Sequence, residues 1–360
     1  MGRPAVLPEP VLPAGSQVGP HLSEPRARVR NVSITTDRDT VAEHLEPFRR
    51  ELTAYCYRML GSAFEAEDAV QETLLRAWSK FDGFQGRSQL RTWLYRIATN
   101  VCLDMAPAAQ RRARPMDLSS PGSAAAPNLT QLEENIWVGP IPDDRVLAGD
   151  PAEVAVGRES IRLAFIAALQ KLAPRQRAVL ILREVLAWSA AETAELLDST
   201  VASVNSALQR ARATLAEGGT ADADTAKPLD EEQREFLAKY VKAFEAFDID
   251  GLTALLRADV SLNMPPFELW LQGVEELRTW WNGAGSGCRG SRLFPVAANG
   301  VPAFAQYRPA EDGDGWTPWA IMLLDIREGR LAGIGSYLDT ERLFPLFGMP
   351  ARIQADGTPG

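Results

Sequence analysis

The sequence SAFEAEDAVQETLLRAWSKFDGF occupies residues 62–84, and RTWLYRIATNVCLD follows at residues 91–104. Ser62 and Glu65 stand at the spacing of a capping box, which favours a helix start at this point. Apolar side chains then recur every three or four residues, as in an amphipathic helix with one buried stripe: Ala66, Val70, Leu74, Ala77 and Phe81. The two segments together predict a helical bundle.

The first of these helices carries a second, polar stripe: Asp68, Gln71, Glu72 and Arg76. Such a stripe is often only a solvated face with ion pairs along the helix. The alternative is a face that docks on another protein.

The second helix combines arginines with aromatic rings. Its core period is set by Leu90, Leu94, Ile97, Val101 and Met105. The basic face, away from that stripe, is expected to carry Arg91, Arg96, Thr99 and Asn100. Trp93 and Tyr95 are expected to flank this basic face. Arginines bind phosphates and rings stack on exposed bases, so this pattern favours binding of single-stranded DNA. A core position for Trp93 is the alternative.

Charge is distributed unevenly along the chain. The 360 residues carry a net charge of −9, yet six arginines and one aspartate give residues 84–114 a charge of +5. Residues 229–360 carry −7. A basic stripe inside an acidic chain indicates phosphate contact focused on one element.

A second helical pattern occupies residues 189–216. Ser189 and Glu192 form another capping box, and a short helix then leads to the turn at residues 198–200. The next helix places Val204, Leu208, Ala211 and Leu215 on one face. Two helices joined by a three-residue turn are typical of a helix-turn-helix, whose second helix reads base edges in the major groove. Any helical hairpin gives a similar pattern.

Composition excludes several classes of protein. The chain has two histidines, neither beyond His44, and three distant cysteines, so neither a zinc site nor a histidine triad is expected after that point. No run of 18 apolar residues occurs, and the proline-containing start does not resemble an export signal. The cysteine usage fits a reducing, cytoplasmic location. We expect no metal and no cofactor.

Breaks in periodicity divide the chain into segments. We expect a disordered tail (1–42), a helical domain (43–114), a linker (115–158), a second helical domain (159–217), a linker (218–228), an α+β domain (229–348) and a tail (349–360).

The two helical patterns, in this order, resemble regions two and four of the sigma-70 family. The closest resemblance is to extracytoplasmic-function (ECF) sigma factors, with LAPRQRAVLILREVLAWSAAETAELLDSTVASVNSALQRARATL (172–215) as region four. The sequences MPPFELWLQG (264–273), NGVPAFAQY (299–307) and YLDTERLFPLFGMP (337–350) resemble the C-terminal SnoaL-like domain of the sigma-G and sigma-J type. The resemblance implies two all-α domains plus an α+β cone of the SnoaL-like (ketosteroid-isomerase-like) kind.

The resemblance also implies partners: core RNA polymerase, promoter DNA, and either a separate regulatory protein or a small-molecule ligand of the C-terminal domain. It places polymerase binding at Asp68, Gln71, Glu72 and Arg76. It places contacts to the melted −10 region at Arg87, Arg91, Trp93, Arg96, Thr99, Asn100, Arg111 and Arg112. Contacts to the −35 duplex would come from Thr200, Ser203, Asn205, Ser206, Gln209, Arg210 and Arg212.

The sequence departs from the family in the recognition helix. Basic residues are common in the family where Asn205 and Ala207 stand, and glycine is common at Asp198. We therefore expect low −35 affinity for the isolated second helical domain. Pro107 is expected to end the first basic helix early.

The C-terminal domain is expected to hold a pocket lined by Trp270, Trp281, Tyr307 and Trp319, unless these rings simply fill the cone. A ligand-responsive factor and a SnoaL-like enzyme are the alternative functions. An enzyme would need Asp325 or Asp339 as a buried acid or base. We expect regulation of the helical domains and no catalysis.

Overall fold

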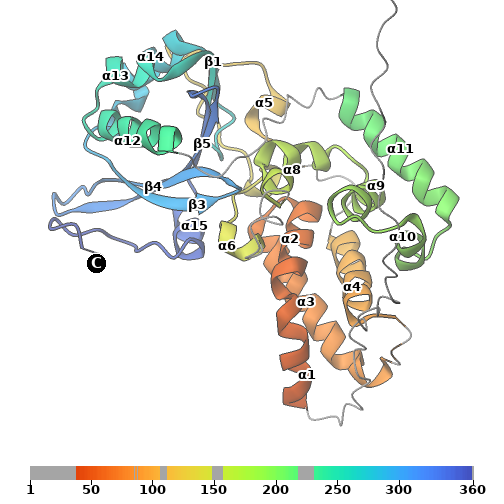
Figure 1. The fold of residues 1–360 in the computed structure, drawn as a ribbon. Helices are drawn as coiled ribbons and strands as arrows, with labels where there is room; N and C mark the ends of the chain where they lie inside the picture. Colours follow the sequence, from red (N-terminus) through yellow and green to blue (C-terminus); the bar gives the residue numbers. More distant parts are fainter. Residues whose placement is uncertain are drawn as a thin grey trace, which may run out of the picture. The chain divides into compact units, whose positions relative to one another are not determined.

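The computed structural model describes residues 38–84, 86, 88–105, 112–147, 157–217 and 231–358. The described residues from 38 onward form one compact unit (Figure 1). The linker expected at residues 218–228 lies outside the described residues. The tail expected at residues 1–42 needs a correction, because a helix already begins at Arg38.

The first helical block, residues 38–105, is built as its periodicity predicts. Its elements are α1 (Arg38–Leu45), η1 (Glu46–Phe48), α2 (Arg49–Leu60), α3 (Ala63–Lys80), η2 (Phe81–Gly83) and α4 (Leu90–Met105). Gly61 ends α2 in the left-handed region at φ 75°. Ser62 then caps α3 by accepting a hydrogen bond from the backbone N of Glu65. The carboxylate of Glu65 pairs with Arg112 instead of closing the capping box.

The second helical block, residues 157–217, contains the helix-turn-helix. Its main elements are α8 (Leu163–Gln170), α9 (Pro174–Leu180), the π-helical η4 (Ile181–Val185), α10 (Ala190–Leu196) and α11 (Val201–Glu217). Ser189 and Glu192 form the complete capping box that the sequence predicts. Asp198 turns the chain at φ 46°, a backbone conformation that aspartate tolerates better than most residues.

The two helical blocks share one hydrophobic core instead of forming separate domains. Leu52 and Tyr55 of α2 belong to the same buried cluster as Leu182 of η4 and Val204 of α11. Buried Arg177 of α9 donates hydrogen bonds to the carbonyls of Met59 and Leu169, which ties α9 to α2. Sequence periodicity could not predict this shared core, because an amphipathic stripe does not indicate which element it packs against.

The intervening segment, residues 112–147, is not the free linker that its prolines and glycines predict. It contains α5 (Pro115–Leu118), η3 (Glu134–Ile136) and α6 (Asp143–Val146). Its backbone is paired with the C-terminal domain, since Gly122 N donates to the Trp270 carbonyl and Glu268 N to the Thr130 carbonyl. Long-range pairing of this kind leaves no periodic signal in sequence.

The C-terminal domain, residues 231–358, is an α+β cone. Its helices are α12 (Glu231–Glu245), α13 (Ile249–Ala254), α14 (Val274–Asn282), η5 (Ala284–Cys288) and α15 (Thr340–Leu346). Its strands are β1 (Leu256–Asn263), β2 (Trp270–Gln272), β3 (Arg292–Ala298), β4 (Val301–Pro309), β5 (Trp316–Arg327) and β6 (Arg330–Tyr337). The order is β2-β1-β6-β5-β4-β3, and β1 and β6 run parallel while the other neighbours are antiparallel.

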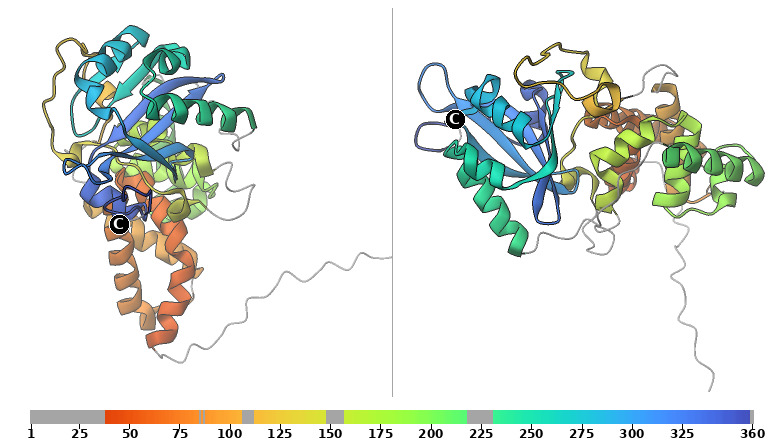
Figure 2. Two further views of the ribbon diagram at one scale, coloured as in Figure 1. Left: turned by 90° about the vertical axis from the view of Figure 1, so that its left-hand side faces the viewer. Right: turned by 90° about the horizontal axis from the view of Figure 1, so that it is seen from above.

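The sheet separates two cores. On one face, α12, α13 and α14 cover a cluster that includes Phe304 and Met322 (Figure 2). On the other face, α15 covers a cluster that includes Tyr307, and Phe64 of α3 and Leu163 of α8 pack at its edge. The outer face of the sheet therefore meets both helical blocks.

The C-terminal tail also needs a correction. Ile353 exchanges two backbone hydrogen bonds with Trp316, at 2.8 and 2.9 Å, and is buried. The chain from residue 349 to 358 thus closes onto β5 and does not form a loose tail.

Candidate functional site

The polar stripe of α3 is exposed, as a docking face requires. Asp68 and Gln71 are exposed, while Glu72 pairs with Arg76 at 2.6 Å and Arg76 also approaches Asp104 at 3.5 Å. Sequence reasoning missed two apolar neighbours on this helix, because neither belongs to the buried stripe. These are Leu75, which is 62% exposed, and Trp78, which is 40% exposed. Exposed apolar side chains beside polar ones are typical of a protein-binding surface.

On α4, Arg91 sits between aromatic rings. Its Nε donates to Glu51 at 2.8 Å, and its guanidinium carbon lies 5.0 Å from the centre of the Tyr95 ring and 5.6 Å from that of Trp188. Asn100 is exposed.

Trp93 belongs to an aromatic cluster at the start of α4. Its ring centroid lies 5.0 Å from that of Phe84 and 6.3 Å from that of Phe81. Trp93 is half-buried and packs against the hydrophobic core, so the core alternative describes part of its surface, and base stacking by the rest stays a prediction.

Two residues expected to contact the −10 region are buried instead. Thr99 is 1% exposed and donates to the Tyr95 carbonyl while sharing a hydrogen bond with the Tyr55 hydroxyl. Arg112 is 9% exposed, pairs with Glu65 and donates to the carbonyl of Trp137. Helix α4 is buried on a wider face than its leucines indicate, since Tyr95 and Thr99 pack on α2. Arg87 and Arg111 lie outside the described residues.

The second helical block covers part of α4. Arg96 donates to the carbonyl of Glu195 on α10 at 2.8 Å and lies 3.9 Å from its carboxylate. The Tyr95 and Trp188 ring centroids are 5.2 Å apart. Two of the side chains on the basic helix, Arg91 and Arg96, are therefore engaged by the α10 region.

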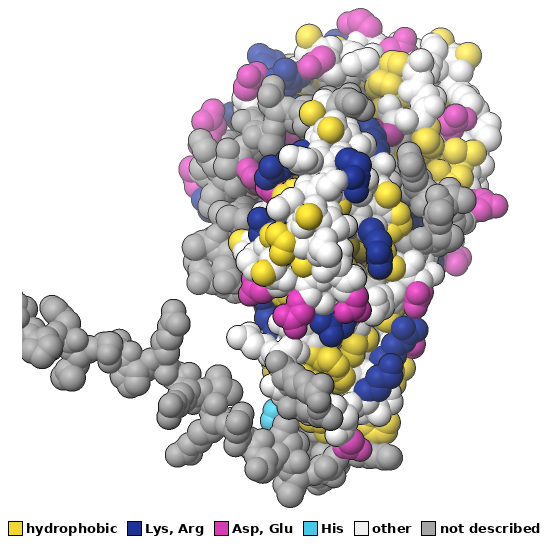
Figure 3. All heavy atoms as spheres, turned by 90° about the vertical axis from the view of Figure 1, so that its right-hand side faces the viewer, with side chains coloured by type: hydrophobic (Ala, Val, Ile, Leu, Met, Phe, Trp, Pro, Cys, Tyr) yellow, Lys and Arg dark blue, Asp and Glu magenta, His cyan; other side chains and the backbone are white. Residues whose placement is uncertain are grey.

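The recognition helix α11 presents its polar face to solvent. The predicted contact residues are all exposed or half-buried: Thr200, Ser203, Asn205, Ser206, Gln209, Arg210 and Arg212. Several of them have partners, because Arg210 donates to the Ser206 hydroxyl at 2.6 Å, the Thr200 hydroxyl accepts from the backbone N of Ser203 at 3.2 Å, and Arg212 pairs with Glu184. Figure 3 faces α10 and α11 and shows basic side chains interspersed with acidic and apolar ones on this side.

The four aromatic residues expected to line one pocket do not lie together. Trp281 is buried under the helices of the cone. Tyr307 points to the opposite face of the sheet and donates from its hydroxyl to the Pro350 carbonyl. The Trp270 indole donates to the Ser119 carbonyl of the intervening segment, and Arg308 lies over the Trp319 ring. Side chains alternate between the faces of a strand, which puts Tyr307 and Phe304 on opposite sides of the sheet.

The two aspartates that an enzyme would require have structural partners. Asp325 pairs with Arg327 at 2.9 Å, and Asp339 caps α15 by accepting from the backbone N of Arg342. Among the residues that the structure describes, no cluster of histidine, cysteine or acidic side chains fits a metal ion. Within the same residues, no helix combines the length and apolar character needed to cross a membrane.

Comparison with known proteins identifies the family to which both helical blocks belong. A sequence model of sigma-70 region 2 matches residues 45–112, and one of sigma-70 region 4 matches residues 162–215. The ECF RNA polymerase sigma factor SigG of Mycobacterium tuberculosis is 43% identical over 345 residues, which cover 91% of this chain and 92% of SigG. The chain belongs to the ECF RNA polymerase sigma factors. The expected family is thereby confirmed.

Other ECF sigma factors are similar over smaller parts or in fold. SigW of Bacillus subtilis is 29% identical over 179 residues, or 50% of this chain and 88% of SigW. The crystal structure of SigJ from Mycobacterium tuberculosis matches with a TM-score of 0.55 and 22% identity, covering 86% of this chain and 99% of SigJ. Since this coverage exceeds the helical blocks, the likeness of fold extends into the C-terminal domain.

As an ECF sigma factor, the chain binds core RNA polymerase and directs it to promoters. It is a transcription initiation factor and not an enzyme, as expected from the sequence. The first helical block is its region 2, and the second contains its region 4.

Proposed function

We propose that the structure is the closed, resting state of this sigma factor, which acts in the cytoplasm on RNA polymerase. In this proposal the exposed face of α3 with Leu75 binds the polymerase, α4 captures the melted −10 strand, and α11 reads the −35 duplex. The observation that carries the proposal is the contact of α10 with Arg96 on α4, beside the packing of Trp188, just before α10, on Tyr95 (Figure 1).

Simple geometry supports an opening step. The −10 and −35 elements are separated by about 25 base pairs, or roughly 85 Å at about 3.4 Å per pair. Helix α10 touches α4, and α10 with its 7 residues and α11 with its 17 residues span only about 10 and 25 Å at about 1.5 Å per residue. In this arrangement α4 and α11 lie too close together to engage both elements, so the two blocks must separate on the promoter.

The described surfaces also indicate what the DNA contacts would be. Trp93, Phe81 and Phe84 offer rings beside the amino end of α4, where unstacked bases can pack. Unstacking costs a few kcal/mol, which pocket contacts offset. On α11 the exposed amide and hydroxyl side chains suit base edges, while Arg210 and Arg212 suit phosphates.

The C-terminal domain is proposed to modulate activity by holding the closed state. The β3–β4 turn reaches the helical blocks: Asn299 donates to the Tyr57 hydroxyl of α2 at 2.7 Å and to the Ile161 carbonyl at 2.6 Å. A second link is Arg342 of α15, which lies over the Phe64 ring of α3. One domain thus contacts both blocks that have to separate.

The test of the function is initiation by the purified chain with core polymerase on genomic promoter fragments. We expect specific transcripts, and their absence from every fragment would contradict the assignment. The test of closure is Glu195→Ala, with the exposed Glu311→Ala as a charge-matched control. An exposed ion pair is worth about 0.2–1 kcal/mol, so Glu195→Ala is expected to tighten binding of a single-stranded −10 oligonucleotide by a factor between about 1.4 and 5. Equal binding by the two variants would refute the closed state.

A further inference from the structure

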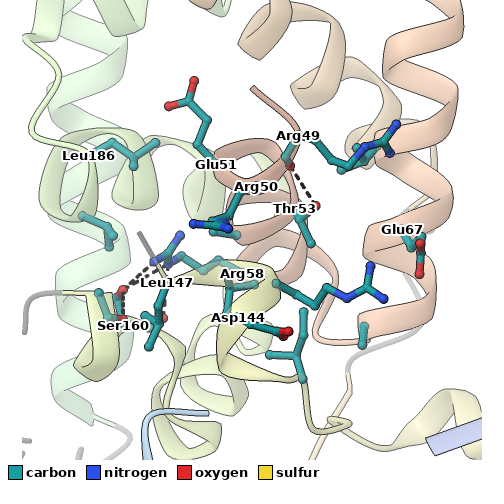
Figure 4. Close-up of a pocket in the computed structure, with 18 of the residues that line it drawn as sticks. Arg49, Arg50, Glu51, Thr53, Arg58, Glu67, Asp144, Leu147, Ser160 and Leu186 are labelled. Atoms are coloured by element: carbon teal, nitrogen blue, oxygen red, sulfur yellow. Dashed lines mark hydrogen bonds between the residues drawn. The ribbon is translucent and has the colours of Figure 1, made fainter. Parts of the chain in front are cut away.

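A cavity lies where both helical blocks meet the intervening segment. Its volume is about 1050 Å³, at the upper limit of the roughly 300–1,000 Å³ typical of sites that bind small molecules. Helices α2 and α3 form one wall, α6 forms another, and Val185 and Leu186 close it from the second block (Figure 4). Sequence reasoning did not anticipate this site, because its walls come from segments far apart in the chain.

Arginines dominate the charge of this cavity. Five line it, and two of them are neutralised locally: Arg49 by Glu46 at 2.6 Å and Arg91 by Glu51 at 2.8 Å. The remaining three are Arg50, Arg58 and Arg145. Among the described residues, no carboxylate lies within 4.0 Å of these three guanidinium groups. Glu67 and Asp144 also line the cavity and leave it with a small excess of positive charge.

Arg58 is the unusual member, because it is buried without an anion. It is 5% exposed, and among the described residues its guanidinium donates hydrogen bonds only to Ser160: Nη2 to the hydroxyl at 2.6 Å, and Nε to the hydroxyl at 3.2 Å and the carbonyl at 3.3 Å. Desolvation lowers its pKa to about 10. A buried cation that faces only neutral oxygens is held at a cost in free energy, and an anion beside it would offset that cost.

Figure 4 shows Arg50 and Arg58 projecting from α2 into the same cavity. Guanidinium groups bind phosphate and carboxylate oxygens through paired hydrogen bonds. Much of the remaining lining is aliphatic and would contact an apolar body: Ala54, Val70, Ile141, Val146, Leu147 and Leu186. We propose that this cavity binds a small amphipathic oxyanion, with its phosphate or carboxylate at Arg50 and Arg58.

The site has a consequence that rests on the proposed closed state. The cavity has walls from both blocks, and Ser160, which precedes α8, anchors Arg58 of α2. A ligand that fills it binds the closed arrangement better than the open one and shifts the population toward closure. Because closure covers part of α4, the oxyanion would act as an inhibitor of −10 strand binding.

The binding test uses the full chain and three probes with the same chain length: octyl phosphate, octanoate and octyltrimethylammonium. Each is titrated calorimetrically below its micelle-forming concentration and at fixed ionic strength. We expect both oxyanions to bind and the cation not to bind, and the tighter oxyanion identifies the headgroup. Equal binding of all three probes, or no binding of either oxyanion up to about 1 mM, would overturn the proposal.

Variants locate the site. Because Arg58 is buried and its replacement disturbs packing, the principal variant is the exposed Arg50→Gln, with the exposed Arg234→Gln on α12 as the matched control. We expect Arg50→Gln to weaken octyl phosphate binding about tenfold and Arg234→Gln to leave it unchanged. Equal affinities for the two variants would place the ligand elsewhere.

A last measurement separates this proposal from the proposed function. Octyl phosphate is expected to weaken association of the wild-type chain with a single-stranded −10 oligonucleotide, and to do so about tenfold less potently for Arg50→Gln. Binding of octyl phosphate without any effect on that association would retain the site and refute its link to closure. The function itself is judged without the probe, by initiation from promoter fragments.

Discussion

Asn299 of the C-terminal domain forms hydrogen bonds to both helical blocks. It is fully buried at the tip of the β3–β4 turn, where its side-chain oxygen accepts from the backbone N of Ile141 at 2.9 Å. Its amide nitrogen donates to the Tyr57 hydroxyl and the Ile161 carbonyl. The informative substitution is Asn299→Gly, because the residue sits at φ 51° and glycine adopts that conformation without strain.

The free-energy cost of Asn299→Gly follows from the buried polar groups that lose their hydrogen-bond partner. Tyr57 keeps its hydrogen bond to the Gly139 carbonyl, but the Ile141 N–H and the Ile161 carbonyl lose the Asn299 amide in a buried place. A buried group without its partner costs about 1–3 kcal/mol, so the pair amounts to about 3 kcal/mol after some entry of water. That free energy corresponds to about a hundredfold shift from the docked toward the undocked C-terminal domain.

Amide hydrogen exchange measures this shift directly. We expect the Ile141 amide to exchange about a hundredfold faster in Asn299→Gly than in the wild type. The control is Asn282→Gly, at an exposed position at the end of α14. Exchange at Ile141 within about threefold of the wild type would refute the reasoning, because the amide would then not depend on Asn299.

Leu75→Ser on α3 is expected to weaken binding to core polymerase about tenfold without lowering the melting temperature, since the side chain is 62% exposed; a titration with labelled polymerase together with a thermal melt checks both. Gln209→Ala is expected to change the preferred −35 bases, and Arg210→Ala is expected to weaken −35 binding to all sequences alike. Each change in binding free energy is expected to be about 1–3 kcal/mol or less, with opening at −10 unchanged. Footprints on promoters with altered −35 elements check both effects, and loss of opening at −10 would contradict them. Burial raises the pKa of Asp143, which accepts from the Gly300 N–H, above its ordinary 3.8. The docked state then binds more protons, so docking weakens as the pH rises from about 4 through the raised pKa; Asp143→Asn is expected to flatten this dependence in exchange experiments, and an unchanged pH profile would count against it.

Local signals in the sequence predict the helices well. The capping box at Ser189 and the turn at Asp198 are set by residues a few positions apart, and both are present. The Glu328–Gly329 hairpin is another local feature, with positive φ at both residues. Strand β3 has a weak local signal because Pro295 interrupts its pattern, and proline is tolerated there since β3 lies at the sheet edge.

The errors share one physical cause, which is contact between distant segments. Periodicity places Thr99 on the polar side of α4, but the hydroxyl of Tyr55 on α2 gives it a buried partner. Arg112 belongs to a basic run, but it is buried in an ion pair with Glu65, which lies 47 positions earlier in the chain. A helical wheel does not show that a second face of a helix packs against another helix. Composition does not show which acidic side chain lies beside a given arginine.

The hydrophobic core common to α2, η4 and α11 gives the two helical blocks a thermal signature. Separating them transfers apolar surface into water, and such transfer raises the heat capacity by about 0.45 cal/K/mol for each Å² exposed. The attraction between the blocks consequently weakens on cooling. In the proposed closed state, the two helical blocks would therefore hold together less tightly in the cold, before any signal arrives.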